Sequence, residues 1–156
     1  MEQIRYSGKR LAEVLGVSTR DLSRAEEAGL VKSSLPPAGT ASAPRIVYSV
    51  DDLHAARAAL GRMPPHRPMR RQLFLNFKGG TGKTSVSTSY AFRLAEMGHR
   101  VLVIDLDSQG HASKCLGVAG EEAEKTLFDA IIKKTPLDQV IVPTGMPGLH
   151  LVPSNL

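Results

Sequence analysis

The sequence predicts an α/β fold, a doubly wound and mostly parallel sheet in its second part, preceded by a small, mainly helical domain. Three observations lead to this prediction. An apolar run at residues 73–77 is followed at once by a glycine-rich turn and a long helical pattern. A second apolar run at 100–105 resembles strands that are covered on both faces, and strands alternating with helices favour a doubly wound sheet. The first 61 residues instead show short helical patterns around a polar loop.

The first part of the chain carries local signals for three helices. Leu11, Val14 and Leu15 share one helix face, and a glycine follows them as a stop. Serine precedes each of the next two helical patterns, as N-cap residues do. The segment 33–44 is rich in Ser, Pro, Ala and Gly and is expected to be a loop. The expected elements are helices at 8–16, 19–28 and 50–60, the last two capped by Ser18 and Ser49, and a β-type stretch at 45–48.

Residues 62–71 are expected to form a stiff basic linker, because they hold three prolines and four arginines but no acidic residue. A contact of this segment with DNA phosphates is the alternative to a solvated tether. The linker would separate a domain at 1–61 from an α/β region at 72–156. In that region we expect strands at 73–77, 100–105 and 149–152 and helices at 84–97 and 121–134.

Composition favours a globular protein of the cytosol. No apolar run approaches the roughly 20 residues that span a bilayer, and the start lacks a signal-peptide core, so no membrane association is expected. Cys115, the single cysteine, cannot form an internal disulfide and is expected to fill the core. Residues 1–71 hold twelve Lys and Arg against seven Asp and Glu, whereas 72–156 hold eight of each. This basic excess suits a polyanion, although surface arginines that only aid solubility explain it equally well.

The strongest motif is a glycine-rich loop from Phe77 to Ser85 (FKGGTGKTS) between an expected strand and an expected helix. Glycines let main-chain N–H groups approach phosphate oxygens, and the following helix adds the positive end of its dipole. Lys83 can reach the β- and γ-phosphates, and the Thr84 hydroxyl can ligand Mg²⁺. ATP and Mg²⁺ are therefore the expected cofactors. The expected nucleotide-binding residues are Lys78, Gly79, Gly80, Thr81, Gly82, Lys83, Thr84 and Ser85.

A plain P-loop has a glycine at the position of Phe77, and here a second lysine, Lys78, opens the loop instead. In this the segment resembles the deviant Walker A motif of the ParA/MinD family of P-loop ATPases. The resemblance implies that Lys78 reaches across an ATP-bound homodimer to the partner's phosphates, and that Lys78 and Lys83 are both catalytic. An added cation there would stabilise transition-state charge. The alternative is an ordinary surface lysine beside an anion site.

A second motif, Val101 to Gly110 (VLVIDLDSQG), resembles the Walker A′ segment of the same family, with Ser108 in place of the usual proline. Asp105 and Asp107 follow an expected parallel strand, at the end where α/β proteins bind ligands. The resemblance implies that Asp107 is catalytic and positions the attacking water, and that Asp105 holds Mg²⁺ through water. The capping of a turn is the alternative for Asp105 alone.

The resemblance extends over residues 72–156, where Pro153-Ser154-Asn155 matches a strand end that is common in the family. The chain ends before the family's Walker B segment and its adenine-contacting residues. We therefore expect ATP hydrolysis from the full-length protein and not from this chain alone.

Residues 16–30 resemble the recognition-helix stretch of MerR-type winged helix-turn-helix domains. In such domains the second helix enters the major groove of DNA. The resemblance implies DNA contacts from that helix and from a wing. A small three-helix domain used for dimerisation is the alternative, because helix-turn-helix patterns are weakly specific. The expected DNA-binding residues are Thr19, Arg20, Ser23, Arg24 and Arg45.

Together the two parts resemble partition ATPases of the ParA type with an N-terminal DNA-binding extension. The resemblance implies a cytoplasmic, nucleoid-associated protein in which ATP drives dimerisation and non-specific DNA binding. A ParB-like partner would stimulate hydrolysis, a plasmid or chromosome would be segregated, and operator binding would be a second role. Two other functions stay open: a repressor regulated by nucleotide, and the positioning of a non-DNA cargo such as a chemoreceptor cluster or a division site. The nitrogenase iron protein group is set aside, because one cysteine cannot hold its cluster.

Overall fold

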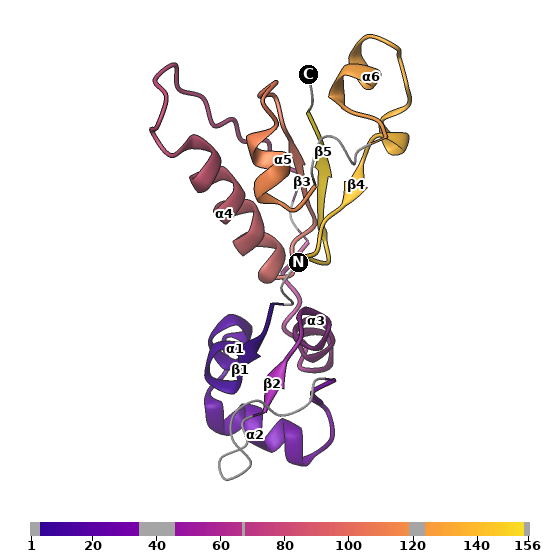
Figure 1. The fold of residues 1–156 in the computed structure, drawn as a ribbon. Helices are drawn as coiled ribbons and strands as arrows, with labels where there is room; N and C mark the ends of the chain where they lie inside the picture. The colour runs from indigo at the N-terminus through magenta and orange to yellow at the C-terminus, as the bar shows by residue number, and fades with distance from the viewer. Residues whose placement is uncertain (1–3, 35–45, 67, 119–123, 155–156) are drawn as a thin grey trace. The chain divides into compact units, whose positions relative to one another are not determined.

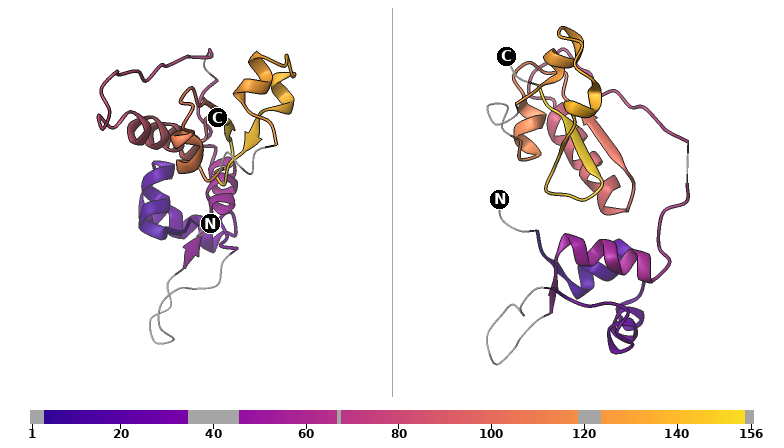
Figure 2. Two further views of the ribbon diagram at one scale, coloured as in Figure 1. Left: turned by 45° about the horizontal axis from the view of Figure 1, so that its top comes forward. Right: turned by 90° about the vertical axis from the view of Figure 1, so that its right-hand side faces the viewer.

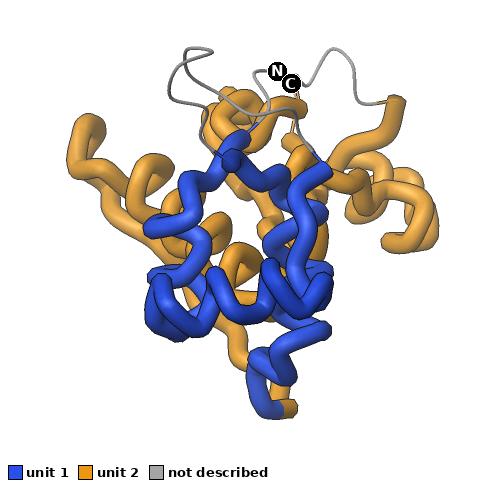
Figure 3. Tube along the Cα trace, turned by 90° about the horizontal axis from the view of Figure 1, so that it is seen from below, with its two compact units in different colours: residues 1–65 blue, residues 66–156 orange. Residues whose placement is uncertain are grey.

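The structure is a computed structural model that describes residues 4–34, 46–66, 68–118 and 124–154. It divides into two compact units, residues 1–65 and 66–156 (Figure 3). The boundary between the units falls inside the predicted linker at 62–71. Each unit has its own buried core, with Leu11 and Leu53 at the centre of the first and Leu151 in the second.

Unit 1 consists of three helices and a short antiparallel ribbon (Figure 1). The helices are α1 (Gly8–Leu15), α2 (Thr19–Glu27) and α3 (Val50–Ala59), within a residue of the predicted bounds. In the ribbon, β1 (Tyr6–Ser7) pairs with β2 (Val47–Tyr48), and Tyr6 lies opposite Tyr48. The sequence did not predict β1, because two residues are too few to show an alternating pattern.

Side-chain caps begin each of these three helices. Ser7, Ser18 and Ser49 accept hydrogen bonds from main-chain N–H groups three residues further on, which satisfies donors that a helix start leaves free. The carboxylate of Asp52 completes a capping box with Ser49, and its two oxygens also share the hydrogen of the main-chain N–H of Ser34 in a bifurcated hydrogen bond. The predicted caps at Ser18 and Ser49 are confirmed, and they fix where α2 and α3 begin.

The buried guanidinium of Arg57 fastens α3 to α1. It donates to the carbonyl of Val14 at 3.1 Å and to the carbonyl of Arg62 at 3.1 Å. The Val14 carbonyl lies in the last turn of α1, and the Arg62 carbonyl lies just after α3. Carbonyls at the end of a helix have no intrahelical partner. Hydrogen bonds to a charged donor are stronger than neutral ones, so this contact helps to hold α1 against α3.

Unit 2 contains a three-stranded sheet with the order β3-β5-β4. The strands are β3 (Val101–Ile104), β4 (Val142–Pro143) and β5 (Leu149–Val152); β3 and β5 are parallel, whereas β4 is antiparallel to β5. α4 (Lys83–Glu96) packs on β3 and against α5 (His111–Cys115). α6 (Leu127–Ile131) and the short 3₁₀ helix η1 (Leu137–Gln139) precede β4, and α6 lies near the β4 edge of the sheet (Figures 1 and 2).

The predicted buried strand at 73–77 is wrong, because these residues have no regular structure. Leu73 and Leu75 are exposed, and Phe77 is 99% exposed. Of this run only Phe74 makes an aromatic contact, with Tyr90 of α4. A strand forms only where a neighbouring strand accepts its hydrogen bonds, and no strand of the described residues lies alongside. The apolar run indicated burial but could not indicate a pairing partner.

The sheet is smaller and more mixed than predicted. The described strands make one parallel and one antiparallel pair, so a doubly wound sheet is not complete in them. β3 was predicted to be covered on both faces, but its side chains alternate and Leu102 and Ile104 are 42% and 47% exposed. Only one face of β3 is therefore packed by described residues, the face on which α4 lies.

Two further predictions are wrong in unit 2. The helix predicted at 121–134 is limited to α6, because Thr126 and Asp129 form a capping box that starts it and Lys134 adopts a left-handed φ of 57° beyond its end. Residues 121–123 lie outside the described residues. Cys115 is exposed and does not fill the core, because α5 turns Ser113 inward instead. Ser113 has no exposed surface, and its polar contacts below explain why a serine takes the buried position.

Candidate functional site

The glycine-rich loop turns directly into α4. Gly80 and Gly82 adopt left-handed φ angles of 70° and 79°, which other residues rarely take, and Gly82 is the N-cap of the helix. This helix start has no side-chain cap and no acidic residue in its first turn. Free N–H groups and the positive end of the helix dipole therefore remain available to an anion. The predicted strand–turn–helix context is present except for the strand.

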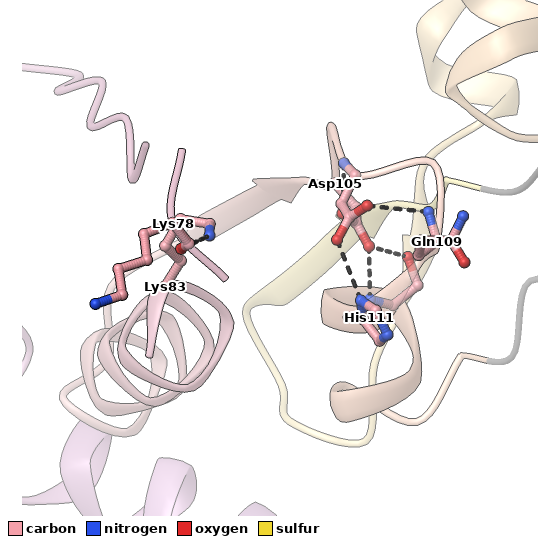
Figure 4. A network of polar contacts seen from close by, with 7 residues as sticks. Lys78, Lys83, Asp105, Gln109 and His111 are labelled. Atoms are coloured by element: carbon pink, nitrogen blue, oxygen red, sulfur yellow. Dashed lines mark hydrogen bonds and ion pairs between the residues drawn. The ribbon is translucent and has the colours of Figure 1, made fainter. Parts of the chain in front are cut away.

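The main chain of Lys78 orders the loop. Its carbonyl accepts a hydrogen bond from Nζ of Lys83 at 3.1 Å (Figure 4). The same carbonyl accepts another from the Thr81 hydroxyl at 3.2 Å, and the N–H of Lys78 donates to Oδ1 of Asn76 at 3.0 Å. Sequence reasoning did not select Asn76. Its signal is an asparagine two residues before a tight turn, the position from which its side chain caps main-chain N–H groups.

Thr84 lies in the first turn of α4 and is half-buried. Its carbonyl accepts hydrogen bonds from the hydroxyls of Ser87 and Thr88, but none of the contacts among described residues uses its own hydroxyl. Ser85 follows and is exposed. A hydroxyl in the first turn of a helix can be a ligand of Mg²⁺. A neighbouring lysine ammonium and free main-chain N–H groups can donate to phosphate oxygens.

The second candidate loop, residues 105–113, is built around the buried carboxylate of Asp105, which is 3% exposed. One of its oxygens accepts from the N–H of Asp107 at 3.1 Å. The other accepts from the N–H and the hydroxyl of Ser113, at 2.9 and 2.8 Å. These contacts favour the turn-capping alternative for Asp105, because both oxygens hold the chain itself. Its Mg²⁺ role stays a prediction.

The Ser113 hydroxyl continues this network to the end of β5 by accepting from the N–H of Ser154 at 3.2 Å. Gly110 and the main chain of Ser154 also approach each other closely. A Cβ atom at Gly110 would lie 2.8 Å from the carbonyl oxygen of Ser154, and the φ of Gly110 is +62°. Glycine is thus required at this position for two reasons, sterics and backbone conformation.

Asp107 is the exposed carboxylate of this loop. One oxygen accepts from the N–H of Gln109 at 3.0 Å, and the other lies 3.2 Å from Nδ1 of His111. These two contacts lower the pKa of Asp107, and the charges of His111 and Lys83 lower it further. Asp107 is therefore a carboxylate within electrostatic reach of the P-loop lysine. The packing of α4 against α5 thus brings the two predicted loops into one neighbourhood, whereas none of the contacts among the described residues joins the exposed side chain of Lys78 to Asp107.

In unit 1 four of the five residues predicted to bind DNA share the exposed surface of α2. Leu22 and Ala25 face the core, which turns the intervening polar residues outward. Arg45 lies outside the described residues. The exposed residues are Thr19, Arg20, Ser23 and Arg24.

Comparison with known proteins gave matches over both units. The family model described as "AAA domain" (AAA_31) matches residues 69–156. The cell division protein PomZ of Myxococcus xanthus (strain DK1622) is 51% identical over 156 residues, covering 100% of this chain and 44% of that protein. The chromosome partitioning protein ParA of Caulobacter vibrioides (strain NA1000 / CB15N) is 38% identical over 88 residues, 56% of this chain and 33% of that protein.

A solved structure titled "Partition Protein" matches this chain with a TM-score of 0.56 and 20% identity, and the match covers 96% of this chain and 44% of that one. This likeness shows a shared fold. The chain spans less than half the length of the curated relatives named above. None of the helices in the described residues is long and apolar enough to cross a membrane.

Proposed function

Because the chain belongs to the ParA-type family of P-loop ATPases, we propose that the full-length protein is an ATPase of cell division, which positions its cargo by ATP-dependent dimerisation and DNA binding. The observation that carries this proposal is the loop from Lys78 to Ser85 at the mouth of α4. Its left-handed glycines and uncapped helix start suit a nucleotide's phosphates, and the charge of Lys83 reaches the carboxylate of Asp107.

ATP and Mg²⁺ are the ligands that these residues fit. Main-chain N–H groups of Gly79 to Ser85 would hold phosphate oxygens, and the Thr84 hydroxyl would be a ligand of the metal. Lys83 would leave the Lys78 carbonyl to contact the phosphates. When bound, the magnesium ion neutralises charge on the phosphate groups. Asp107 would orient the attacking water, and the exposed side chain of Lys78 would reach a second copy of the chain across the nucleotide.

Unit 1 is proposed to be a MerR-like winged helix-turn-helix module that binds DNA. Two capped helices, α1 and α2, joined at Gly16, and a two-stranded ribbon support this proposal. The exposed face of α2 presents the guanidinium groups of Arg20 and Arg24, which suit phosphate or guanine contacts. Thr19 and Ser23 would add polar contacts, and Arg45 would act from the wing. A dimerisation module remains the alternative for unit 1.

The cell-division role is favoured by the PomZ relative, which is 51% identical over the whole of this chain, whereas the ParA relative is 38% identical over 56% of it. Segregation of a chromosome or plasmid with a ParB-like partner is the second candidate, and the name of the ParA relative supports it. The phenotype of a strain in which the gene is deleted distinguishes the division role from the partition role. Filamentous cells with normally segregated chromosomes would support the division role, whereas anucleate cells that divide on time would support partition and refute it.

A further inference from the structure

The geometry around Asp107 assigns a role to a residue outside the predicted site. We propose that His111 is a positioning residue for ATP hydrolysis, which holds the Asp107 side chain by donating a hydrogen bond from Nδ1 to the Asp107 carboxylate. This inference rests on the proposed ATPase function. It adds a residue that orients the carboxylate and does not itself touch the nucleotide.

The first step of the argument is that the loop carrying both residues is a rigid frame. Asp105 holds the N–H of Asp107 and, through Ser113, the first turn of α5. Ser113 in turn holds the N–H of Ser154 after β5, and Gly110 fits closely against the same strand end. The main-chain positions of Asp107 and His111 are therefore fixed by buried contacts, independently of their own side chains.

The second step is that the carboxylate itself is exposed and needs restraint. The side chain of Asp107 is 49% exposed and that of His111 is 60% exposed. A free carboxylate rotates about χ1 and χ2, and water orientation requires one of those rotamers. The N–H of Gln109 restrains one oxygen, and Nδ1 of His111 restrains the other (Figure 4).

The third step concerns the chemistry of the pair. Since a carboxylate only accepts hydrogen bonds, Nδ1 of His111 must carry the proton in this contact. Each carboxylate oxygen has a second lone pair, so Asp107 can still accept a hydrogen bond from a water molecule. His111 lies four residues after Asp107, at the first position of α5, so that the frame itself sets the distance between them.

The fourth step is that removing His111 should not unfold the protein. An exposed pair at this spacing contributes little to stability. His111→Ala therefore tests orientation and not folding. His111→Asn is the matched rescue, because its amide nitrogen is as many bonds from Cα as Nδ1 of histidine and can donate to the same oxygen. His150→Ala in β5 is a control that removes another exposed histidine from the same unit.

The experiment measures ATP turnover and nucleotide affinity of the full-length protein with DNA present. We expect His111→Ala to lower kcat about 10-fold with nucleotide affinity unchanged, because misplacement of a catalytic group acts on the chemical step. His111→Asn should restore kcat to within about twofold, and His150→Ala should leave it unchanged.

Three results would overturn the role of His111: an unchanged kcat in His111→Ala, an equal loss in His111→Asn, or a loss of nucleotide affinity with kcat unchanged. A wild-type protein that binds DNA but neither binds nor hydrolyses ATP would refute the proposed function itself, and the role of His111 with it. The wild-type measurement therefore distinguishes the two failures.

Discussion

Replacing the buried Ser113 by alanine should weaken the attachment of α5 to the segment that follows β5. The hydroxyl donates to Asp105 at 2.8 Å and accepts from the N–H of Ser154 at 3.2 Å. A hydrogen bond to a charged group contributes about 1.5–3 kcal/mol, and a buried N–H without an acceptor costs about 1–3 kcal/mol. Since one hydroxyl serves both contacts and the terms are not additive, we expect Ser113→Ala to cost about 3 kcal/mol.

Amide hydrogen exchange measures this cost locally, without requiring that both units unfold together. A loss of about 3 kcal/mol corresponds to roughly 100-fold faster exchange of the amides in β5 and α5. Ser108→Ala is the control, because Ser108 is exposed and its side chain makes no hydrogen bond among the described residues. Exchange in Ser113→Ala within about fivefold of wild type would refute the view that this hydroxyl joins β5 to the loop.

Three further predictions concern the surfaces of the two units. Lys83→Ala should weaken ATP binding by about 100-fold in a fluorescent-nucleotide titration, because a charged contact to phosphate is lost; unchanged affinity would exclude the P-loop role. Arg20→Ala and Arg24→Ala should each lower the slope of log affinity for DNA against log salt by about 1, and an unchanged slope would favour the dimerisation alternative. Contacts with Lys133 and the Thr126 N–H lower the pKa of Asp129 to about 2, so this carboxylate stabilises the start of α6 above pH 4. The stabilisation should disappear as the pH falls from about 4 to about 2, seen by NMR as lower protection factors of the α6 amides once the slower intrinsic exchange at low pH is corrected for; protection factors unaffected by this change would contradict it.

Signals local in the chain predicted much of the fold. Ser18 and Ser49 marked the starts of α2 and α3, and Gly16 marked the end of α1, because caps act within one helical turn. The range of β5, 149–152, was also predicted. Strand pairing was not, since the partner of a strand lies far away in the sequence. The run that ends at Phe77 therefore looked like a strand although no described strand accepts its hydrogen bonds.

The candidate site followed the same rule. The glycine loop could be found from its residue spacing, and the two aspartates from the resemblance to the Walker A′ segment and their place after an expected strand. The roles of Asn76 and His111 depend on side-chain contacts that appear only when the loops are folded. The exposure of Cys115 depended on which face of α5 turns toward Asp105 and Ser154, and that orientation was not visible in five residues of sequence.

A crystal structure of the full-length protein with Mg²⁺ and a non-hydrolysable ATP analogue would test the site most directly. We predict that main-chain N–H groups between Gly79 and Ser85 donate to the phosphates, and that Nζ of Lys83 leaves the Lys78 carbonyl to join them. A nucleotide bound elsewhere, with Lys83 still donating to that carbonyl, would contradict the assignment of this loop as the phosphate site.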